Sequence, residues 1–142
     1  MPYTPQTWVD NNGTYPLSAA RMGVIETGIQ AATATAELAV NLTLNQQTVT
    51  SYTLLLSDRN KMVEMNNASA NTVTVPLNSA QAFPIGAQVT ILQSSTGQTT
   101  IAFTAGVTVN GTPGLKLRTQ WSSATLVKRG TDIWVAIGDL TA

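Results

Sequence analysis

Residues 71–103 read NTVTVPLNSAQAFPIGAQVTILQSSTGQTTIAF, and this stretch decides the fold of the chain. Apolar and β-branched residues alternate with Thr and Gln over 71–75, 88–93 and 99–103. Turn residues such as Pro84-Ile85-Gly86 and the run 94–97 separate these segments. Alternation with a period of two is typical of strands that bury one face, and Gly, Pro and Ser favour turns. The stretch therefore predicts three short β-strands joined by tight connections.

The same pattern continues on both sides of this stretch, over 52–56, 62–65, 107–109, 115–117, 124–128 and 133–137. Short strands at this spacing predict a mainly β fold: an antiparallel β-sandwich, a jelly-roll-like module or a small barrel over residues 46–142. The apolar residues of each strand's inward face should form the core. They are Leu54, Leu56, Val63, Met65, Val73, Val75, Val89, Ile91, Ile101, Phe103, Leu126, Trp134 and Ala136.

Residues 1–45 have a different character and form a separate N-terminal region. Half of the prolines in the chain lie within residues 1–17. Proline removes backbone donors and keeps the preceding residue extended, so this segment is not helical. Tyr3, Trp8 and Tyr15 give it an aromatic content that disordered tails usually lack. We expect an extended arm that docks on another surface through these three rings, with simple disorder as the alternative.

A short helix follows the arm, with Ser18 as its N-cap. Apolar and small residues recur along it at alternating spacings of three and four, which is typical of a coiled-coil seam. The seam contains Met22, Ile25, Ile29, Ala32, Ala36 and Ala39. One interpretation is a single amphipathic helix packed on its own β-module. The other is a short parallel bundle of identical helices, which the small alanines favour because they permit close approach.

Composition excludes several classes of function. Seven basic and seven acidic side chains cancel, so the chain lacks the positive charge that nucleic-acid binding requires. The absence of Cys and His excludes disulfides, thiolate nucleophiles and every metal site built on these residues. No apolar run approaches the roughly 18 residues of a membrane span. Residues 1–5 lack the features of a signal peptide, so we expect synthesis in a cytoplasm.

The few carboxylates do not predict catalysis. Asp58 with Glu64, or Asp132 with Asp139, could form the pair that a glycosidase needs. However, Asp58 and Asp132 lie in turn sequences, where Asp commonly bonds to its own backbone. A calcium site would need several carboxylates in one loop. We therefore expect no catalytic residue, no metal site and no cofactor.

Two other groups of residues have alternative interpretations. Lys116, Arg118, Lys128 and Arg129 form a mild basic cluster, which is either a solvated strand face or a contact for an acidic partner. Trp134 lies between apolar neighbours inside a strand and should belong to the core. Trp121 follows polar residues and is a candidate for a subunit contact or a sugar-stacking site.

Several stretches resemble phage virion proteins. Thr7-Trp8-Val9-Asp10, the run PLSAARM at 16–22 and the run IETGI at 25–29 resemble a segment near the start of such proteins. Asn11-Asn12 replaces the Asp-Gly turn usual in that segment, and Ser18 stands where Asn is common. The segments 73–76, 83–86, 125–128 and 134–140 are similar to small head-fibre, decoration and tail-fibre modules.

The resemblance implies a homotrimer that is joined through its N-terminal region and displays its β-modules. Met22, Ile25, Ile29, Ala32 and Ala36 would then form the oligomer interface, and the arm would dock on the major capsid protein of the same virion. The short chain favours a capsid decoration or head-fibre protein on the outer surface of the capsid. The first alternative is a tail-fibre module that recognises a host surface glycan. The second is a carbohydrate-active enzyme, which the composition disfavours.

Overall fold

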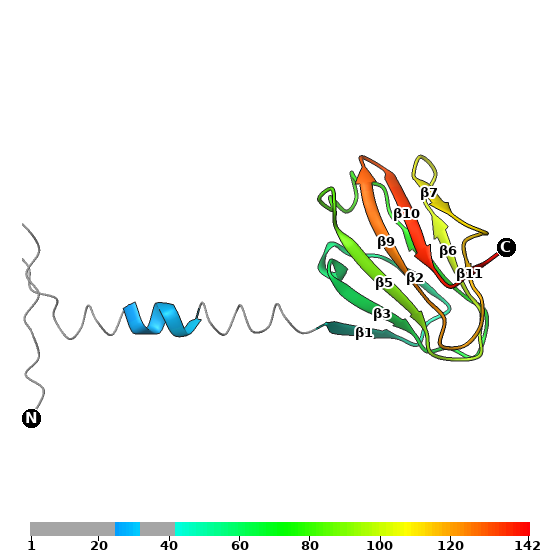
Figure 1. Ribbon diagram of the computed structural model, residues 1–142, viewed down its shortest axis with the longest axis horizontal. Coiled ribbons are helices and arrows are strands. Elements are labelled where there is room, and N and C mark those ends of the chain that lie inside the picture. Colours follow the sequence, from blue (N-terminus) through cyan, green and yellow to red (C-terminus); the bar gives the residue numbers. More distant parts are fainter. Residues whose placement is uncertain (1–24, 32–41) are drawn as a thin grey trace, which may run out of the picture. The chain divides into compact units, whose positions relative to one another are not determined.

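The computed structural model describes residues 25–31 and 42–142 (Figure 1). Residues 25–31 form a short α-helix. The chain from Leu42 to Ala142 forms a separate β-domain. The prediction of a mainly β fold with a short N-terminal helix is confirmed for these residues. The boundaries of 1–45 and 46–142 need one adjustment, because the first strand already begins at Thr43.

Short strands make up most of the β-domain. They are β1 (Thr43–Gln47), β2 (Ser51–Thr53), β3 (Lys61–Met65), β4 (Asn71–Val75), β5 (Gln88–Gln93), β6 (Thr99–Phe103), β7 (Thr108–Gly111), β8 (Lys116–Leu117), β9 (Ser123–Gly130), β10 (Ile133–Gly138) and β11 (Leu140–Thr141). A 3-10 helix, η1 (Leu56–Asp58), follows β2. Each predicted strand overlaps an observed one, whereas β1 and β11 were not predicted as strands.

The strands form two sheets. The six-stranded sheet has the order β1-β3-β5-β9-β10-β7, and the five-stranded sheet has the order β11-β8-β6-β4-β2. Figure 1 shows β1, β3, β5, β9 and β10 side by side. From β1 to β6 the chain alternates between the sheets, and each strand lies parallel to the next strand of its own sheet. Successive turns of the chain therefore stack in register, as in a β-solenoid.

The later strands close this stack in the antiparallel direction. β9 pairs antiparallel with β5 and β10, and β8 pairs antiparallel with β6 and β11. β7 adds to the six-stranded sheet parallel to β10. The sheets are thus mixed, and the prediction of an antiparallel module is correct only for the C-terminal part. A period of two marks a half-buried strand of either direction, so alternation alone does not encode how strands pair.

One hydrophobic core lies between the sheets and draws on both of them. It contains all the predicted core residues except Leu56 and Phe103, which are 43% and 46% exposed. Leu56 leaves the strand pattern because it begins η1, and Phe103 is the last residue of β6. The sequence analysis missed several buried residues in short strands and connections. They are Phe83, Ala87, Val107, Val109, Leu117, Ala124 and Leu140.

Trp134 is buried in this core, as predicted. Its ring packs edge-on against Phe83, with the two ring centroids 5.3 Å apart. Phe83 belongs to the long connection between β4 and β5, so this contact closes the connection over one end of the core. Aromatic pairs in this arrangement contribute about 0.5–1.5 kcal/mol beyond the area that they bury.

A buried polar network holds the turns at the end of the stack where β3 and β5 finish. The Asn71 side-chain amide donates to the backbone oxygens of Ser69 and Gly97, at 3.1 and 3.3 Å. Its oxygen accepts a bond from the Thr99 hydroxyl at 2.7 Å. The Thr99 backbone N–H in turn donates to the Gln93 side chain at 3.0 Å. These bonds join successive turns across the solenoid and fix their relative positions.

Candidate functional site

The structure describes only part of the predicted oligomer interface and none of the predicted arm. Ile25 and Ile29 lie one helical turn apart on the helix 25–31, so they share a face. Their side chains are 50% and 61% exposed. Met22, Ala32 and Ala36 lie outside the described residues, and so do Tyr3, Trp8 and Tyr15. The seam and the docking arm therefore stay predictions.

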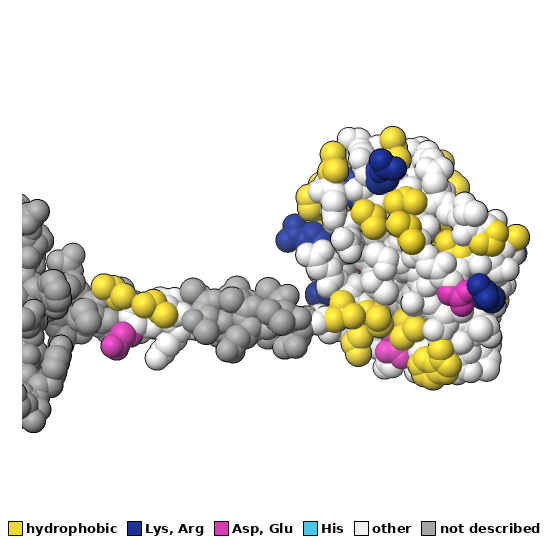
Figure 2. Space-filling view, in the orientation of Figure 1, with side chains coloured by type: hydrophobic (Ala, Val, Ile, Leu, Met, Phe, Trp, Pro, Cys, Tyr) yellow, Lys and Arg dark blue, Asp and Glu magenta, His cyan; other side chains and the backbone are white. Residues whose placement is uncertain are grey.

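The outer face of the six-stranded sheet is a second apolar surface. On this face Val127 pairs with Val135, and Thr125 pairs with Ile137. Ile137 is 63% exposed, and Leu44 on β1 is 59% exposed. Figure 2 shows apolar side chains among uncharged ones on the visible face of the β-domain, with few charged groups. Such a face suits contact with another protein surface.

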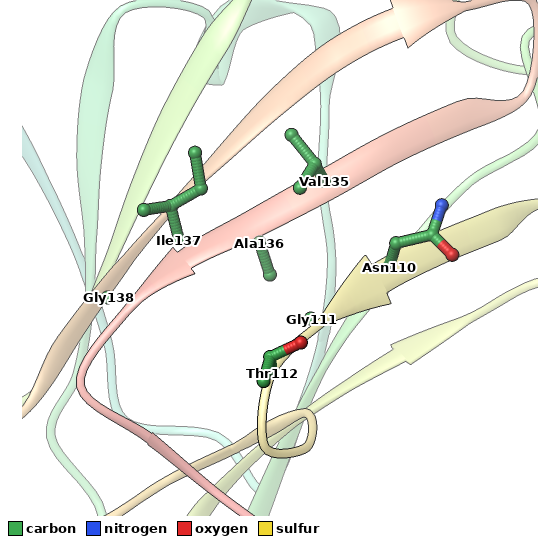
Figure 3. Close-up of a pocket in the computed structure, with 7 residues that line it drawn as sticks. All are labelled: Asn110, Gly111, Thr112, Val135, Ala136, Ile137 and Gly138. Carbon is green, nitrogen blue, oxygen red and sulfur yellow. The ribbon is translucent and has the colours of Figure 1, made fainter.

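A groove of about 340 Å³ opens beside this face, between β10 and the end of β7 (Figure 3). Its lining residues are Asn110, Gly111, Thr112, Val135, Ala136, Ile137 and Gly138. Figure 3 shows the Asn110 amide and the Thr112 hydroxyl as the polar side-chain groups of the groove. None of the lining side chains is titratable at neutral pH, so this groove offers no general acid, base or charged nucleophile.

The turn aspartates have structural bonding partners. Asp58 is buried, and its carboxylate accepts bonds from the Tyr52 hydroxyl, the Asn45 amide and the Leu55 N–H at 2.7–2.8 Å. The bond from Leu55 closes the turn of η1, which is the role expected of a turn aspartate. Asp132 accepts a bond from the Asn78 N–H at 2.6 Å. Both aspartates thus accept hydrogen bonds that hold turns and connections of the β-domain.

The Asp58 contact has a measurable consequence for Tyr52. Burial raises the pKa of Tyr52 from 10.0 to about 12, and the hydrogen bond to Asp58 and its negative charge add to the shift. The neutral phenol is therefore favoured in the folded state. Its contribution to stability is complete below pH 10 and is lost as the pH rises from 10 toward 12, because the unfolded chain ionises first.

We expect the free energy of unfolding to fall between pH 10 and 12, and to fall less steeply in Tyr52→Phe. The measurement is urea denaturation of both proteins at a series of pH values from 8 to 11.5. Ionisation of lysines and of the other tyrosines is common to both proteins, so the difference between the two curves isolates Tyr52. Parallel curves would contradict the expected shift.

Of the predicted basic cluster, Lys116, Arg118 and Arg129 are exposed, whereas Lys128 is not on the surface. Lys128 is 3% exposed. It therefore belongs neither to a solvated strand face nor to a contact surface for an acidic partner. Its ammonium group donates to the backbone oxygen of Phe83 at 2.8 Å and to the Asn78 side chain, and it lies 5.8 Å from the centre of the Trp134 ring. Arg118 forms an ion pair with Asp139. The sequence did hold a signal, because Lys128 continues the inward series of Ala124 and Leu126.

Trp121 is the most exposed aromatic side chain of the described chain, at 67%. It lies in the connection between β8 and β9, and its φ of 70° is in the left-handed region, which non-glycine residues seldom adopt. The Trp121 N–H donates to the Gln93 backbone oxygen at 2.7 Å, and the Gln120 amide donates to the Ser94 backbone oxygen at 3.0 Å. These bonds tie the connection to the end of β5.

A second set of bonds braces the same connection from its other side. The Ser122 hydroxyl donates to the Asp139 carboxylate at 2.6 Å and accepts a bond from the Thr119 N–H at 3.1 Å. Arg118 pairs with the same carboxylate. The exposed indole thus stands on a backbone fixed at both ends. The exposure of Trp121 is compatible with both contact roles considered from the sequence, and its strained φ could not be read from the sequence.

Other kinds of site have no support in residues 25–31 and 42–142. There, no group of three or more His, Cys, Asp or Glu side chains is arranged to hold a metal ion. Within the same ranges, no helix has both the length and the apolar character needed to cross a membrane. Comparison of the chain with models of known protein families and with curated proteins gives no match.

Proposed function

We propose that this chain is a non-enzymatic structural protein of a phage virion. It forms a homotrimer that docks on the outer surface of the assembled capsid through the arm 1–17 and stabilises the shell. The observation that carries the proposal is the exposure of Ile25 and Ile29 on one face of the helix. Isolated short helices are marginal in water, so an exposed apolar stripe on one favours association with other copies.

The β-domain supports a role in display. It has its own core between two sheets, and buried polar side chains in it have hydrogen-bond partners. A domain of this kind folds without help from the helix, so a trimer joined through the helices can carry three of them. The resemblance of residues 7–29 to the start of virion proteins points to the capsid as the partner of the arm.

The chemistry of the β-domain supports a non-catalytic role. Asp58, Asp132 and Asp139 accept structural hydrogen bonds, and the groove beside β10 is lined by groups without charge. A protein that binds only the assembled shell would stabilise it by mass action. The gain is about 2.7 kcal/mol per site at a concentration a hundredfold above the dissociation constant.

The test compares particles that carry this chain with particles from which its gene is deleted. Particles without it should assemble but release their genome at a lower temperature. Adding the purified protein should restore heat resistance, and adding a variant without residues 1–17 should not. Binding of the shortened variant would move the docking surface to the β-domain. Particles that lack the chain, resist heat normally and fail to adsorb to cells would overturn the decoration role.

A further inference from the structure

The turns at one end of the six-stranded sheet form a continuous rim. The rim comprises the turns 48–50, 66–70, 94–98 and 119–122. Backbone bonds connect neighbouring turns: Asn66 donates to Gln47, Gly97 to Asn67, and Trp121 to Gln93, at 2.7–3.2 Å. The Asn67 amide also donates to the Thr48 backbone oxygen at 2.6 Å. The four turns are thus held side by side by their own hydrogen bonds.

The rim is uncharged but rich in hydrogen-bonding groups. These described turns contain Thr, Asn, Ser and Gln, and they contain no Asp, Glu, Lys or Arg. Thr96, Gln98, Thr119 and Gln120, in the same turn as Trp121 or in the turn beside it, are exposed. The nearest basic side chain in sequence, Arg118, is already paired with Asp139. A ligand at this rim therefore meets one aromatic side chain together with hydroxyls and amides, all from turn residues without charge.

The rim lies at the far end of the β-domain from the point where the chain enters it. β1, β3 and β5 are parallel and in register, so Gln47, Met65 and Gln93 end at the same edge. The chain enters through Leu42 and Thr43 at the opposite end of β1. Within the β-domain, the rim is consequently the end that points away from the N-terminal connection.

Trp121 has the properties of a binding residue. A bulky residue in the left-handed region is strained, and such strain persists where the surrounding structure enforces it and is concentrated at functional sites. Here the bonds to Gln93 and Asp139 enforce it while the side chain itself stays in solvent. Packing in the core does not explain why a large aromatic side chain is present at this position, since the Trp121 ring is mostly exposed.

We propose that this rim binds a neutral oligosaccharide, with one sugar ring stacked on Trp121. The face of an indole is electron-rich and attracts the polarised C–H groups of a sugar ring, while the ring's hydroxyls bond to the neighbouring amides and hydroxyls. Phosphate-bearing and acidic ligands fit less well because the rim holds no free cation. The inference concerns the β-domain alone and does not depend on the proposed trimer.

The test uses the full-length protein and an array of immobilised neutral and acidic oligosaccharides built from glucose, galactose, rhamnose and N-acetylglucosamine. The best-bound oligosaccharide is then titrated in solution against the tryptophan fluorescence. We expect binding to neutral members, a change in fluorescence, and an affinity loss of about tenfold or more in Trp121→Ala. The matched control is Ile85→Ala, because Ile85 is also an exposed apolar residue, at 71%, in a different connection. It should bind as the unaltered protein does.

A second variant separates binding from packing. Trp121→Asn places a residue that tolerates the left-handed region, so it should lose binding and unfold at the same temperature as the unaltered protein or higher. A lower unfolding temperature would assign Trp121 to packing and overturn the proposal. Binding to no member of the array, binding insensitive to Trp121→Ala, or Trp121-dependent binding of a protein without any sugar would each overturn it too. In every case sedimentation reports the oligomeric state separately, so failure here is distinct from failure of the proposed function.

Discussion

Gly97→Ala is expected to destabilise the β-domain by roughly 3 kcal/mol or more. A Cβ atom at residue 97 would lie 2.0 Å from the Ser69 oxygen and 2.4 Å from the Asn67 oxygen, both of them backbone atoms. The turn 66–70 would have to move away to relieve this overlap. That movement would break the bond from the Gly97 N–H to Asn67 and the bonds that Asn71 makes to both turns.

The matched control is Gly130→Ala. A Cβ there would meet the Ile133 side chain at 3.6 Å, which is an ordinary contact, and Gly130 lies at the end of β9. Its stability should stay within about 0.5 kcal/mol of the original. Urea denaturation followed by circular dichroism measures both variants. If Gly97→Ala were as stable as Gly130→Ala, the two turns would not pack as closely as the structure places them.

The position of nearly every strand could be predicted from the sequence, because each half-buried strand carries its own alternation. The direction in which these strands pair could not be predicted from the sequence. The connection 48–50 is as short as a hairpin loop, yet it leads from β1 into the other sheet. A short loop usually indicates adjacent antiparallel strands, and this inference fails where the chain alternates between two sheets. Contacts across the stack, such as the bond from Thr99 to Asn71, are what set the parallel register.

Side-chain environments at the ends of strands were only partly predictable. The alternation of inward and outward residues along β9 places Lys128 on the inward face. Its partners Asn78 and Phe83 lie in a distant connection whose path the sequence does not reveal. Lysine was assigned to the surface because charged residues are rarely fully buried. The polar neighbours of Trp121 made it a candidate for exposure, whereas its bracing depends on Gln93 and Asp139.

The double substitution Ile25→Asp with Ile29→Asp is expected to convert the proposed trimer into monomers. Both side chains are on the proposed seam, and a carboxylate at each position would place like charges from three chains close together in an apolar interface. Sedimentation should change from about three times the 15.0 kDa chain mass to the mass of one chain. The β-type circular dichroism spectrum should persist, because the β-domain has its own core.

A double variant with Thr27→Asp and Gln30→Asp supplies the matched control. It adds the same charge to the same helix at positions off the spacing of the seam, so it should stay trimeric. If this control also dissociated, net charge or helix stability would explain the effect and the seam would not. A monomeric unaltered protein at micromolar concentration would contradict self-assembly through the helix. Monomers of the seam variant that keep the β-type spectrum would show that assembly and folding are separable in this chain, as the independent core of the β-domain requires.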